Sequence, residues 1–379
     1  MKIVHVITGL NIGGAELMLF RLISHSTSSG SPNKHVVISL SNHGSLGPEF
    51  VKIGIDVVAL KMSFGMSFFS GLFYLAVKMR REKPDIVQTW MYHSDLIGGL
   101  FARIFTSSKV VWGVRSTFIP QRLFSFTFWL VRLCSIFSYI LPHAIICCAN
   151  SSKDHHLKLG FAKAKMIAIP NGYDFSSFYP FIKLKHKARR DLGFLQHDLV
   201  LGMVGRYDPL KDHENFIRAA SMLSVHIPNV RFCIIGRNIS WTNKKLISLI
   251  DRHDLKDRIM LFGESKQVPY FLSAMDIFCL SSLSEAFPNV LVEAMAMNLP
   301  CVVTNAGDAS IILSDNKNVV PVANPELLAK ALLKLCLLNK AKREAIGKMN
   351  RIKVSQKYGI ADIEKKYTSC YTRLLLNEG

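Results

Sequence analysis

Two glutamates separated by seven residues, Glu285 and Glu293, form the pattern in this sequence that is best suited to chemistry. The first follows an apolar run, Met275–Leu280, which is typical of a buried parallel strand. The second lies in a segment rich in helix-forming residues. Carboxylates are poor ligands for a phosphate, but they readily accept hydrogen bonds from sugar hydroxyls. The pair therefore predicts a site for a phosphorylated sugar. A core helix carrying two surface glutamates is the alternative.

The segment between the two glutamates offers a place for the phosphate. Pro288 suits the first position of a helix, because its missing N–H is not needed there and its φ is already helical. The N–H groups of Asn289 and Val290, together with the positive end of the helix dipole, would then face an anion. The sequence thus predicts a helix that begins near Pro288 and binds phosphate at its N-terminus.

Two cations follow another apolar run. Leu199–Val204 predicts a buried strand, and it is followed by Gly205, Arg206 and, five residues later, Lys211. The glycine allows a ligand to approach the backbone, and the cations can neutralise a diphosphate. The chain contains no Asp-x-Asp triplet, the usual metal grip of metal-dependent sugar transferases. Without a divalent ion, fixed cations and helix N–H groups would have to carry any negative charge that develops, so no metal or cofactor is expected.

Two more predicted strands in this half end in glycine. Val230–Ile235 precedes Gly236, and Arg258–Phe262 precedes Gly263. Parallel α/β sheets bind ligands at the carboxyl ends of their strands. We therefore expect Gly236, Phe262 and Gly263 to lie beside a bound ligand, and the family resemblance given below implies that they lie beside the base and phosphates of a nucleotide.

The N-terminus shows a strand, a glycine loop and a helix in succession. Ile3–Thr8 predicts the strand, and Gly13 and Gly14 open the helix. This order is typical of phosphate-binding Rossmann-like domains. The spacing is not G-x-G-x-x-G, however, and no acidic residue ends the next strand, His35–Leu40, so a dinucleotide dehydrogenase is disfavoured. Gly14 is the candidate residue here, with a tight turn as the alternative.

Two polar residues follow later strands of the same half. His93 lies just after the predicted strand Ile86–Thr89, and Arg115 closes the strand Lys109–Val114. Both positions are at carboxyl ends, where a parallel sheet binds ligands. A single histidine is more often a structural hydrogen-bonding residue. Arg115 is a second-rank candidate for a phosphate or sugar of an acceptor.

Together these motifs resemble the GT-B glycosyltransferases of family 4, a retaining group that builds bacterial surface polysaccharides and lipid-linked glycans. The resemblance rests on the E-x7-E spacing, on the G-R-x4-K pattern of Gly205–Lys211 and on the Gly-Gly-Ala-Glu turn of Gly13–Glu16. It also rests on Pro170–Asp174, which resembles the family hinge P-N-G-[VI]-D except that Tyr173 replaces the aliphatic residue. The resemblance covers most of the chain.

The resemblance implies a role for the carboxylates and cations of the second half. Glu285 would bind hydroxyls of the donor sugar, and Glu293 would bind the ribose of the nucleotide. Arg206 and Lys211 would neutralise the two donor phosphates. The leaving diphosphate oxygen would help to take the proton of the acceptor. Glu285 is the alternative as a covalent nucleophile, by its charge alone.

For the first half, the resemblance implies that the backbone at Gly14 approaches the donor sugar and phosphates. His93 would contact the donor sugar and the reaction centre. Retention of the anomeric configuration is implied by the resemblance alone.

Composition describes a globular, strongly basic chain. Its 379 residues include 47 Lys and Arg against 27 Asp and Glu, a formal charge of +20, while 49% are hydrophobic. Such a charge favours polyanions such as phosphorylated substrates or an anionic membrane. No nucleic-acid-binding motif is present, so nucleic acid is disfavoured. Eight cysteines without paired spacing predict buried free thiols, and MKIVHVITGL is too short for a signal peptide, so a cytoplasmic location is expected.

Alternation of predicted strands and helices implies parallel sheets covered on both faces. The expected fold is α/β of the GT-B type, with two Rossmann-like domains facing an interdomain cleft. Residues 1–172 would form the acceptor-side domain and 173–197 a linker. Residues 198–357 would form the nucleotide-sugar-binding domain, and the helix in 358–379 would pack back on the first domain.

One segment bears on membrane contact. Leu123–Leu141 approaches membrane-spanning length, but Arg132 in its middle would cost about 2.5–3.5 kcal/mol on insertion. It also lies between two strands of one predicted sheet. We expect a helix that is partly core and partly a shallow membrane-facing surface, with a fully buried helix as the alternative. The basic run at Lys183–Arg190 fits a linker or an exposed helix near anionic lipid headgroups.

These observations predict an enzyme that transfers a hexose or N-acetylhexosamine from a nucleotide sugar, most simply UDP-linked, with retention. The expected acceptor is a polyprenyl-diphosphate-linked glycan of O-antigen or capsule synthesis, used by a peripheral protein on the inner face of the plasma membrane. The alternatives are a GT-B-fold UDP-sugar epimerase or phosphorylase, and a non-catalytic basic scaffold on the membrane.

Overall fold

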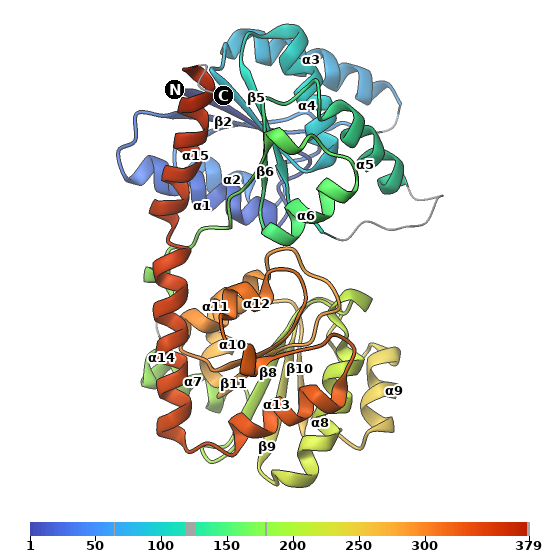
Figure 1. Cartoon of the computed structure of the whole chain (residues 1–379), viewed down its shortest axis with the longest axis vertical. Coiled ribbons are helices and arrows are strands. Elements are labelled where there is room, and N and C mark those ends of the chain that lie inside the picture. Colours follow the sequence, from blue (N-terminus) through green and yellow to red (C-terminus); the bar gives the residue numbers. More distant parts are fainter. Residues whose placement is uncertain (64, 118–125, 179, 377–379) are drawn as a thin grey trace. The chain divides into compact units, whose positions relative to one another are not determined.

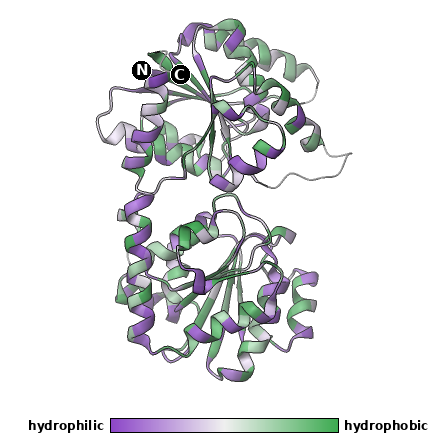
Figure 2. Cartoon of the chain, viewed as in Figure 1, coloured by the Kyte–Doolittle hydropathy of each residue, from purple (hydrophilic) through white to green (hydrophobic). Residues whose placement is uncertain are grey.

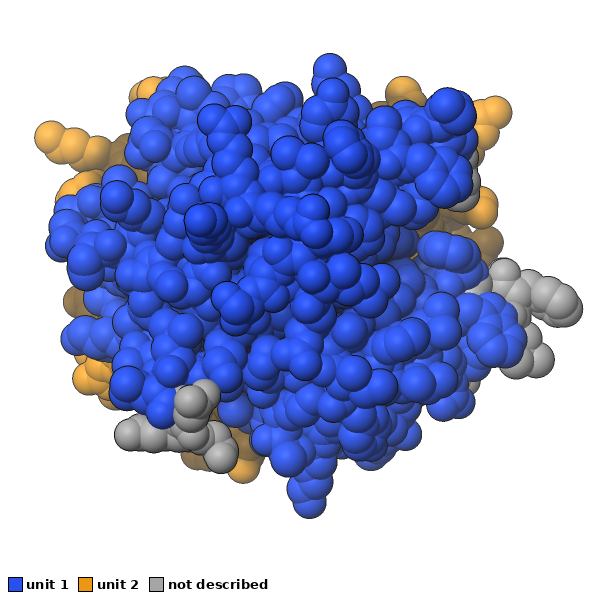
Figure 3. Space-filling model, turned by 90° about the horizontal axis from the view of Figure 1, so that it is seen from above, with its two compact units in different colours: residues 1–173, 358–379 blue, residues 174–357 orange. Residues whose placement is uncertain are grey.

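The computed structural model describes residues 1–63, 65–117, 126–178 and 180–376. These residues form two compact units, which are coloured separately in Figure 3. Unit 1 contains residues 1–173 and the C-terminal segment 358–379, whereas unit 2 contains residues 174–357. Each unit has its own parallel sheet and its own hydrophobic core.

The sheet of unit 1 has seven parallel strands within the described residues (Figure 1). Their order across the sheet is β3-β2-β1-β4-β5-β6-β7. The strands are β1 (Lys2–Ile7), β2 (Lys34–Ser39), β3 (Asp56–Ala59), β4 (Ile86–Trp90), β5 (Lys109–Val114), β6 (Ala144–Cys147) and β7 (Met166–Ala168).

Helices cover both faces of this sheet, because side chains alternate along each strand. In β1, Ile3 and Ile7 join a core with α1, α2 and α15, whereas Val4 and Val6 join a core with α3, α4 and α5. The helices are α1 (Gly14–Ser28), α2 (Gly47–Lys52), α3 (Met66–Glu82), α4 (Tyr92–Phe105), α5 (Phe126–Phe137), α6 (Asn150–Lys158) and α15 (Ile360–Leu375), with a short 3-10 turn η1 (Lys163–Lys165).

The sheet of unit 2 has six parallel strands in the part of the chain that is described, ordered β10-β9-β8-β11-β12-β13. The strands are β8 (Leu199–Val204), β9 (Val230–Ile235), β10 (Ile259–Phe262), β11 (Ile277–Leu280), β12 (Cys301–Thr304) and β13 (Val319–Val320). The helices are α7 (Ile182–Asp191), α8 (His213–His226), α9 (Lys244–Arg252), α10 (Val268–Ala274), α11 (Asn289–Ala296), α12 (Ala309–Leu313), α13 (Pro325–Cys336) and α14 (Lys340–Lys357), with 3-10 turns η2 (Phe175–Ser177), η3 (Pro209–Lys211) and η4 (Asn316–Asn318).

The two parallel sheets confirm the predicted fold class of two Rossmann-like domains. Strands buried on both faces are continuously apolar, and Figure 2 shows the strands of both sheets in the hydrophobic colour. All eight cysteines are free and buried, as the sequence predicts.

The C-terminal helix α15 packs in unit 1, against elements that are far from it in the sequence. Ile363 and Tyr367 of α15 belong to the same core as Met18 of α1. Tyr371 donates a hydrogen bond from its hydroxyl to Oε1 of Gln88 in β4, at 3.1 Å. The last helix therefore completes the core of the first unit.

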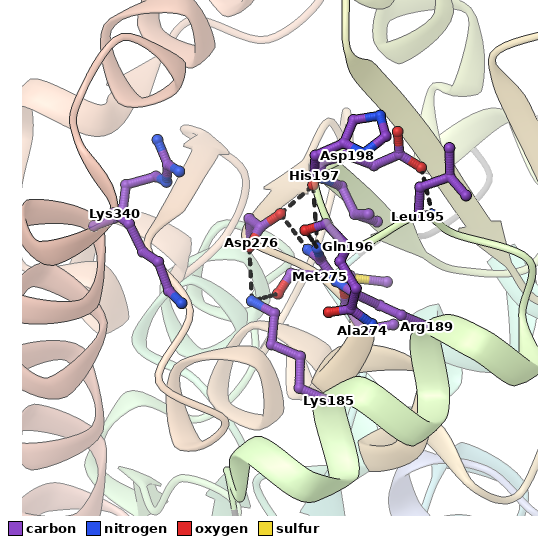
Figure 4. A network of polar contacts seen from close by, with 12 residues as sticks. Lys185, Arg189, Leu195, Gln196, His197, Asp198, Ala274, Met275, Asp276 and Lys340 are labelled. Carbon is purple, nitrogen blue, oxygen red and sulfur yellow. Dashed lines mark hydrogen bonds and ion pairs between the residues drawn. The ribbon is translucent and has the colours of Figure 1, made fainter.

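The sequence predicts a linker at residues 173–197, whereas in the structure residues 174–197 belong to unit 2. They include α7, which packs against α10 within unit 2. Arg189 of α7 is buried, and Asp276 receives hydrogen bonds from Nζ of Lys185 at 2.7 Å, from an Nη atom of Arg189 at 2.5 Å and from the N–H of Val200 at 2.8 Å (Figure 4). Two cations of the basic run, Lys185 and Arg189, are therefore bound to Asp276 at the start of β11 and do not belong to an exposed basic surface.

The segment Leu123–Leu141 divides in a similar way. Its first three residues lie outside the described part of the chain, and α5 begins at Phe126. One side of α5 is buried through Val131 and Cys134, whereas Trp129 and Ile136 are exposed. The alternative of a fully buried helix is therefore wrong for the described residues. Among the described helices, none is both long and apolar enough to cross a membrane.

Two histidines form a buried chain of hydrogen bonds between strands of unit 1. Trp90 donates from Nε1 to Nδ1 of His5 at 3.3 Å, so Nε2 of His5 donates to Nδ1 of His35 at 3.0 Å. Nε2 of His35 then donates to Oγ of Ser26 at 3.0 Å. This sequence of donors requires both imidazoles to be neutral.

Unit 1 should therefore lose stability as the pH falls below about 6.5. Burial and the charge of His35 hold the pKa of His5 well below its usual value, and burial and the N-terminal ammonium lower the pKa of His35 to about 4. In the unfolded chain both histidines titrate near 6.5. As the pH falls below 6.5, the unfolded state therefore binds protons before the folded state does. The melting temperature should fall over this range. In His35→Gln the fall should be smaller, and an unchanged pH dependence in that variant would contradict the assignment.

Candidate functional site

The predicted residues of unit 2 gather at the point where the strand order reverses. β11 lies beside β8 although two strands come between them in the chain. Open α/β sheets bind ligands outside the carboxyl ends of such neighbouring strands. Gly205 and Arg206 follow β8, and Ser281 and Ser282 follow β11. The two motifs found in the sequence therefore lie at one edge of the same sheet.

A carboxylate and an ammonium meet at this edge. Nζ of Lys211 lies 2.5 Å from Oε1 of Glu285, and Oγ of Ser282 donates to the same oxygen at 2.7 Å. The side chains of Lys211 and Glu285 are mostly buried. Both of these hydrogen bonds go to Oε1 of Glu285 and neither goes to Oε2. The pair thus offers a fixed acceptor for a hydroxyl and a cation for an anion within one site.

Hydrogen bonds to backbone carbonyls link the two loops that carry this pair. Oγ of Ser281 donates to the carbonyls of Lys211 and Asp212 at 3.0 and 3.1 Å, and the N–H of Leu283 donates to the carbonyl of Leu210 at 2.8 Å. Rigid support of this kind lets a site bind without first being ordered.

Two glycines let neighbouring loops approach the site closely. Gly307 has φ +57, and a Cβ there would lie 2.2 Å from the carbonyl oxygen of Glu285. Gly236 has φ +153, and a Cβ there would lie 2.1 Å from the carbonyl oxygen of Gly205. Only glycine fits both the conformation and the space. The structure therefore places Gly236 against the loop that begins at Gly205, as part of the scaffold of the site.

Arg206 is held differently from Lys211. Its Nε donates to Oδ2 of Asp208 at 2.9 Å, and its side chain is 51% exposed. Arg206 and Asp208 are therefore a surface pair, which contributes little to stability. The guanidinium remains accessible to an anion arriving from solvent.

The helix after Glu285 begins one residue later than predicted. Pro288 occupies the N-cap position of α11, and Asn289 is its first residue, followed by Val290. The N–H of Leu291 bonds to the carbonyl of Pro288 at 3.0 Å, so the first turn is tight. Glu293 is half-buried on this helix. The start of α11 thus follows the same loop that carries Glu285.

The predicted base contacts lie at the end of β10. The carbonyl of Phe262 accepts a hydrogen bond from the N–H of Gly236 at 3.1 Å, which links this strand end to the loop of Gly205. The ring of Phe262 packs against Phe271 at 5.3 Å between centroids. A Cβ at Gly263 would meet nothing within 4 Å. The backbone at Gly263 is exposed, so a ligand can reach the carboxyl end of β10 from solvent.

In unit 1 the strand order reverses between β1 and β4. Met91, directly after β4, has φ 71 and ψ 158, a conformation that is strained for any residue except glycine. Its N–H donates to the carbonyl of Gly113, and its carbonyl accepts from the N–H of Asp95, both at 2.9 Å. Such strain is concentrated at functional sites, and here it sets the turn that presents His93.

His93 is half-buried at the start of α4. Its ring stacks on Phe126 of α5, with 5.9 Å between centroids. Burial lowers the pKa of His93 from its usual value, so the imidazole is neutral at pH 7. A neutral ring offers one donor and one acceptor, as contact with a sugar requires.

The glycine loop of unit 1 carries its own anion. Gly14 is the exposed first residue of α1, and Gly13 is the N-cap. A Cβ at Gly13 would lie 2.4 Å from Oε2 of Glu16, so that carboxylate lies over the loop. Burial raises the pKa of Glu16, and a hydrogen bond with its own backbone partly offsets this. A phosphate at this helix start would have to displace the carboxylate.

Arg115, the second-rank candidate for contact with an acceptor, has several partners within unit 1. Its guanidinium donates to Oδ1 of Asn171 at 3.0 Å and to the hydroxyl of Tyr367, and it lies 4.3 Å from the centroid of the Trp90 ring. These partners bring α15 and the end of β5 together. Sequence position placed Arg115 at the correct edge, but the partner from α15 lies 252 residues away. Arg115 thus has a structural role.

Sequence reasoning missed several residues of the site. Ser282 shares Oε1 of Glu285 with Lys211, and Glu16 covers the glycine loop. Ser282 had a signal, since it directly follows the carboxyl end of a predicted buried strand. The strain at Met91 had none, because its side chain gives no indication of a positive φ.

Two family models match the chain. Residues 12–177 match Glycosyltransferase Family 4, and residues 185–353 match Glycosyl transferases group 1. The chain is a GT-B glycosyltransferase of the group 1 and family 4 type.

Relatives and solved structures agree with this placement. The glycosyltransferase is 30% identical to the Escherichia coli UDP-Gal:alpha-D-GlcNAc-diphosphoundecaprenol alpha-1,3-galactosyltransferase over 60% of this chain and 59% of that protein. The chain thus matches less than two thirds of that relative. It is 23% identical to the Staphylococcus aureus capsular polysaccharide biosynthesis glycosyltransferase CapM, over 84% of this chain and 85% of that protein. Anabaena HepE in complex with UDP and glucose superposes with a TM-score of 0.85, at 20% identity over 98% of this chain and 99% of that chain, which shows the shared fold.

Proposed function

We propose that this glycosyltransferase moves a hexose or N-acetylhexosamine from a UDP-linked donor, with retention, to a polyprenyl-diphosphate-linked glycan in O-antigen or capsule synthesis. The observation that carries the proposal is the Lys211–Glu285 pair at the junction of β8 and β11. It combines a cation for a diphosphate with a carboxylate for sugar hydroxyls, and Ser282 donates a further hydrogen bond to that carboxylate.

In the proposed reaction, the donor sugar binds to Oε2 of Glu285, and its diphosphate binds the ammonium of Lys211, which Glu285 holds in place. The ammonium then stays with the leaving diphosphate, which carries the charge that develops as the glycosidic bond breaks. Arg206 adds a second cation from its exposed position. Glu293 accepts hydrogen bonds from the hydroxyls of the ribose. The leaving oxygen takes the proton of the acceptor hydroxyl as the new bond forms on the same face of the sugar.

We expect this chemistry to need no metal ion. The chain lacks an Asp-x-Asp triplet, and Lys211, Arg206 and the N-terminus of α11 supply positive charge where a divalent ion would otherwise act. The Lys211 ammonium is held in place by Glu285, so little rearrangement is needed as charge develops.

The proposed acceptor and location rest on surface chemistry and on relatives. The E. coli relative is named for a diphosphoundecaprenol-linked acceptor, and the S. aureus relative for capsule synthesis. In unit 1, α3 and α5 expose a set of large apolar side chains that would suit the boundary of a membrane. This apolar surface consists of Met66, Phe69, Phe73, Tyr74, Phe126, Trp129, Leu133 and Ile136. We propose peripheral contact with anionic lipid on the inner face of the plasma membrane.

The donor class can be tested by thermal shift. UDP and UDP-sugars should raise the melting temperature of unit 2, since a ligand at a hundredfold excess over its Kd adds about 2.7 kcal/mol to the stability of the state that binds it. GDP-, ADP- and dTDP-sugars should give smaller shifts. The measurement is differential scanning fluorimetry of the wild-type chain and of Glu293→Ala.

Glu293→Ala should lose most of the UDP shift, because the ribose loses its carboxylate partner. A matched control is Glu326→Ala on α13, an exposed glutamate of the same unit. A shift that survives in Glu293→Ala, or a preference for another nucleotide, would contradict the proposed donor site.

A further inference from the structure

An apolar pocket of about 500 Å³ opens on the surface of unit 1 beside His93. This is within the range of small-molecule binding sites. Its walls come from the carboxyl ends of β1 and β2 and from α3, α4 and α5. The lining residues that matter here are Phe69, His93, Leu96, Ile97, Phe126 and Leu130.

The lining is suited to hydrocarbon rather than to sugar. Leu96, Ile97 and Leu130 supply aliphatic walls, and Phe69 and Phe126 supply exposed aromatic edges. A sugar bound there would bury several hydroxyls with few partners, and each buried, unpaired hydroxyl costs free energy. The junction of β8 and β11 in unit 2, by contrast, offers carboxylate, ammonium and hydroxyl groups.

The pocket is continuous with the apolar surface, because Phe69 and Phe126 belong to both. The chain around these elements is basic in sequence. Residues 57–81 and 96–153 contain no Asp or Glu, but four and six Lys and Arg. An apolar pocket in a strongly basic chain suits a ligand with a hydrocarbon chain and an anionic head.

We propose that this pocket binds the isoprene units next to the diphosphate of the lipid-linked acceptor, while the rest of the chain follows the apolar surface into the membrane. The proposal rests on the proposed function and adds the site of the lipid. His93 lines the pocket, and the strained turn at Met91 presents it at the carboxyl end of β4. A diphosphate joined to a chain in the pocket therefore lies at the edge of the sheet where this domain type binds ligands.

The test compares acceptors that differ only in their lipid. N-acetylglucosamine diphosphate esterified to methyl, geranyl or farnesyl would be assayed below the concentration at which farnesyl compounds form micelles. The kcat/KM should rise at least about tenfold from methyl to farnesyl, because burial of each further isoprene unit removes apolar surface from water. Equal values for the three acceptors would overturn the proposal.

Two phenylalanines of α3 provide a matched pair of variants. Phe69 lines the pocket and is 69% exposed, whereas Phe73 lies one turn later, is 67% exposed and does not line it. Neither change should affect folding. Phe69→Ser should reduce the ratio of farnesyl to methyl about threefold to tenfold and leave the methyl acceptor unchanged. Phe73→Ser should preserve the ratio. Equal effects of both variants on this ratio would mean that the apolar surface as a whole, and not the pocket, binds the lipid. That result would overturn the proposal.

A binding measurement separates this proposal from the proposed function. Farnesyl diphosphate, methyl diphosphate and a short-chain phosphatidylglycerol would be titrated calorimetrically into the wild-type chain and Phe69→Ser. Binding of farnesyl diphosphate that depends on Phe69 supports the pocket even if no transfer occurs, in which case the proposed function alone fails. Binding of phosphatidylglycerol with the same dependence on Phe69, and no stronger binding of farnesyl diphosphate, would assign the pocket to membrane lipid and overturn the proposal.

Discussion

Replacing Glu285 with glutamine should lower kcat/KM for glycosyl transfer roughly 10²–10³-fold, a loss typical of removing a group that stabilises the transition state. The carboxylate accepts bonds from Lys211 and Ser282 through one oxygen, which leaves the other for a sugar hydroxyl. An amide oxygen is neutral, so the donor sugar loses its charged acceptor, whereas Lys211 keeps its charge for the diphosphate. The affinity for UDP alone should stay within about threefold of wild type, because no sugar is present.

The companion variant is Glu293→Gln, which should have the opposite signature. It should raise the Kd for UDP about tenfold, since a hydrogen bond from ribose to a charged group contributes about 1.5–3 kcal/mol, while kcat at saturating donor falls little. Glu326→Gln serves as the control for a general effect of charge. Equal loss of UDP binding in both active-site variants would show that the two carboxylates do not have separate roles.

Asp276→Asn should destabilise unit 2 by about 3 kcal/mol, because it leaves two mostly buried cations without their counter-charge. Burial alone would raise the pKa of Asp276, but the charges of Lys185 and Arg189 outweigh it and hold that pKa below its usual value. Arg189 also donates to the carbonyls of Ala274 and Asp198, at 3.0 and 3.1 Å, so it cannot leave the interior (Figure 4). The contact between α7 and the sheet therefore depends on this carboxylate.

Hydrogen exchange followed by mass spectrometry gives the stability of each unit separately. In Asp276→Asn, protection should fall in β8 and β11, while the peptides of unit 1 provide an internal reference. The difference from wild type should narrow as the pH falls below about 4, because the unfolded chain then binds a proton at Asp276 before the folded carboxylate, whose pKa is lowered, does so. Asp251→Asn, at an exposed position of α9, should change stability by less than about 0.5 kcal/mol. Unchanged protection in Asp276→Asn would refute this role.

Local sequence predicted those parts of the fold that depend on local periodicity. Strands buried on both faces are continuous apolar runs, and β8, β9 and β5 match the predicted residue ranges. The two-residue strand β13 was not found, because so short an edge strand has no periodicity. The start of α11 was one residue off, because Pro288 fits both the N-cap and the first helical position.

The fate of individual charges could not be predicted from local sequence. Lys185 and Arg189 were placed with an exposed basic run, yet their partner Asp276 lies about 90 residues away, at the start of β11. Arg115 likewise finds Tyr367 on the last helix. Glu285 and Lys211 were placed correctly, because both follow strands and neighbouring strand ends share an edge. Long-range pairing of charges requires the structure.

The central claim, transfer of sugar to a lipid-linked acceptor, is tested most directly by incubating the purified protein with radiolabelled UDP-sugars and N-acetylglucosamine diphosphate farnesyl ester. The assay would run with and without a chelator, and the product would be characterised by NMR. We predict a farnesyl-linked disaccharide with the anomeric configuration of the donor, formed equally well with the chelator present. Interconversion of UDP-sugars without acceptor, a requirement for inorganic phosphate, or no turnover with any donor would contradict the account.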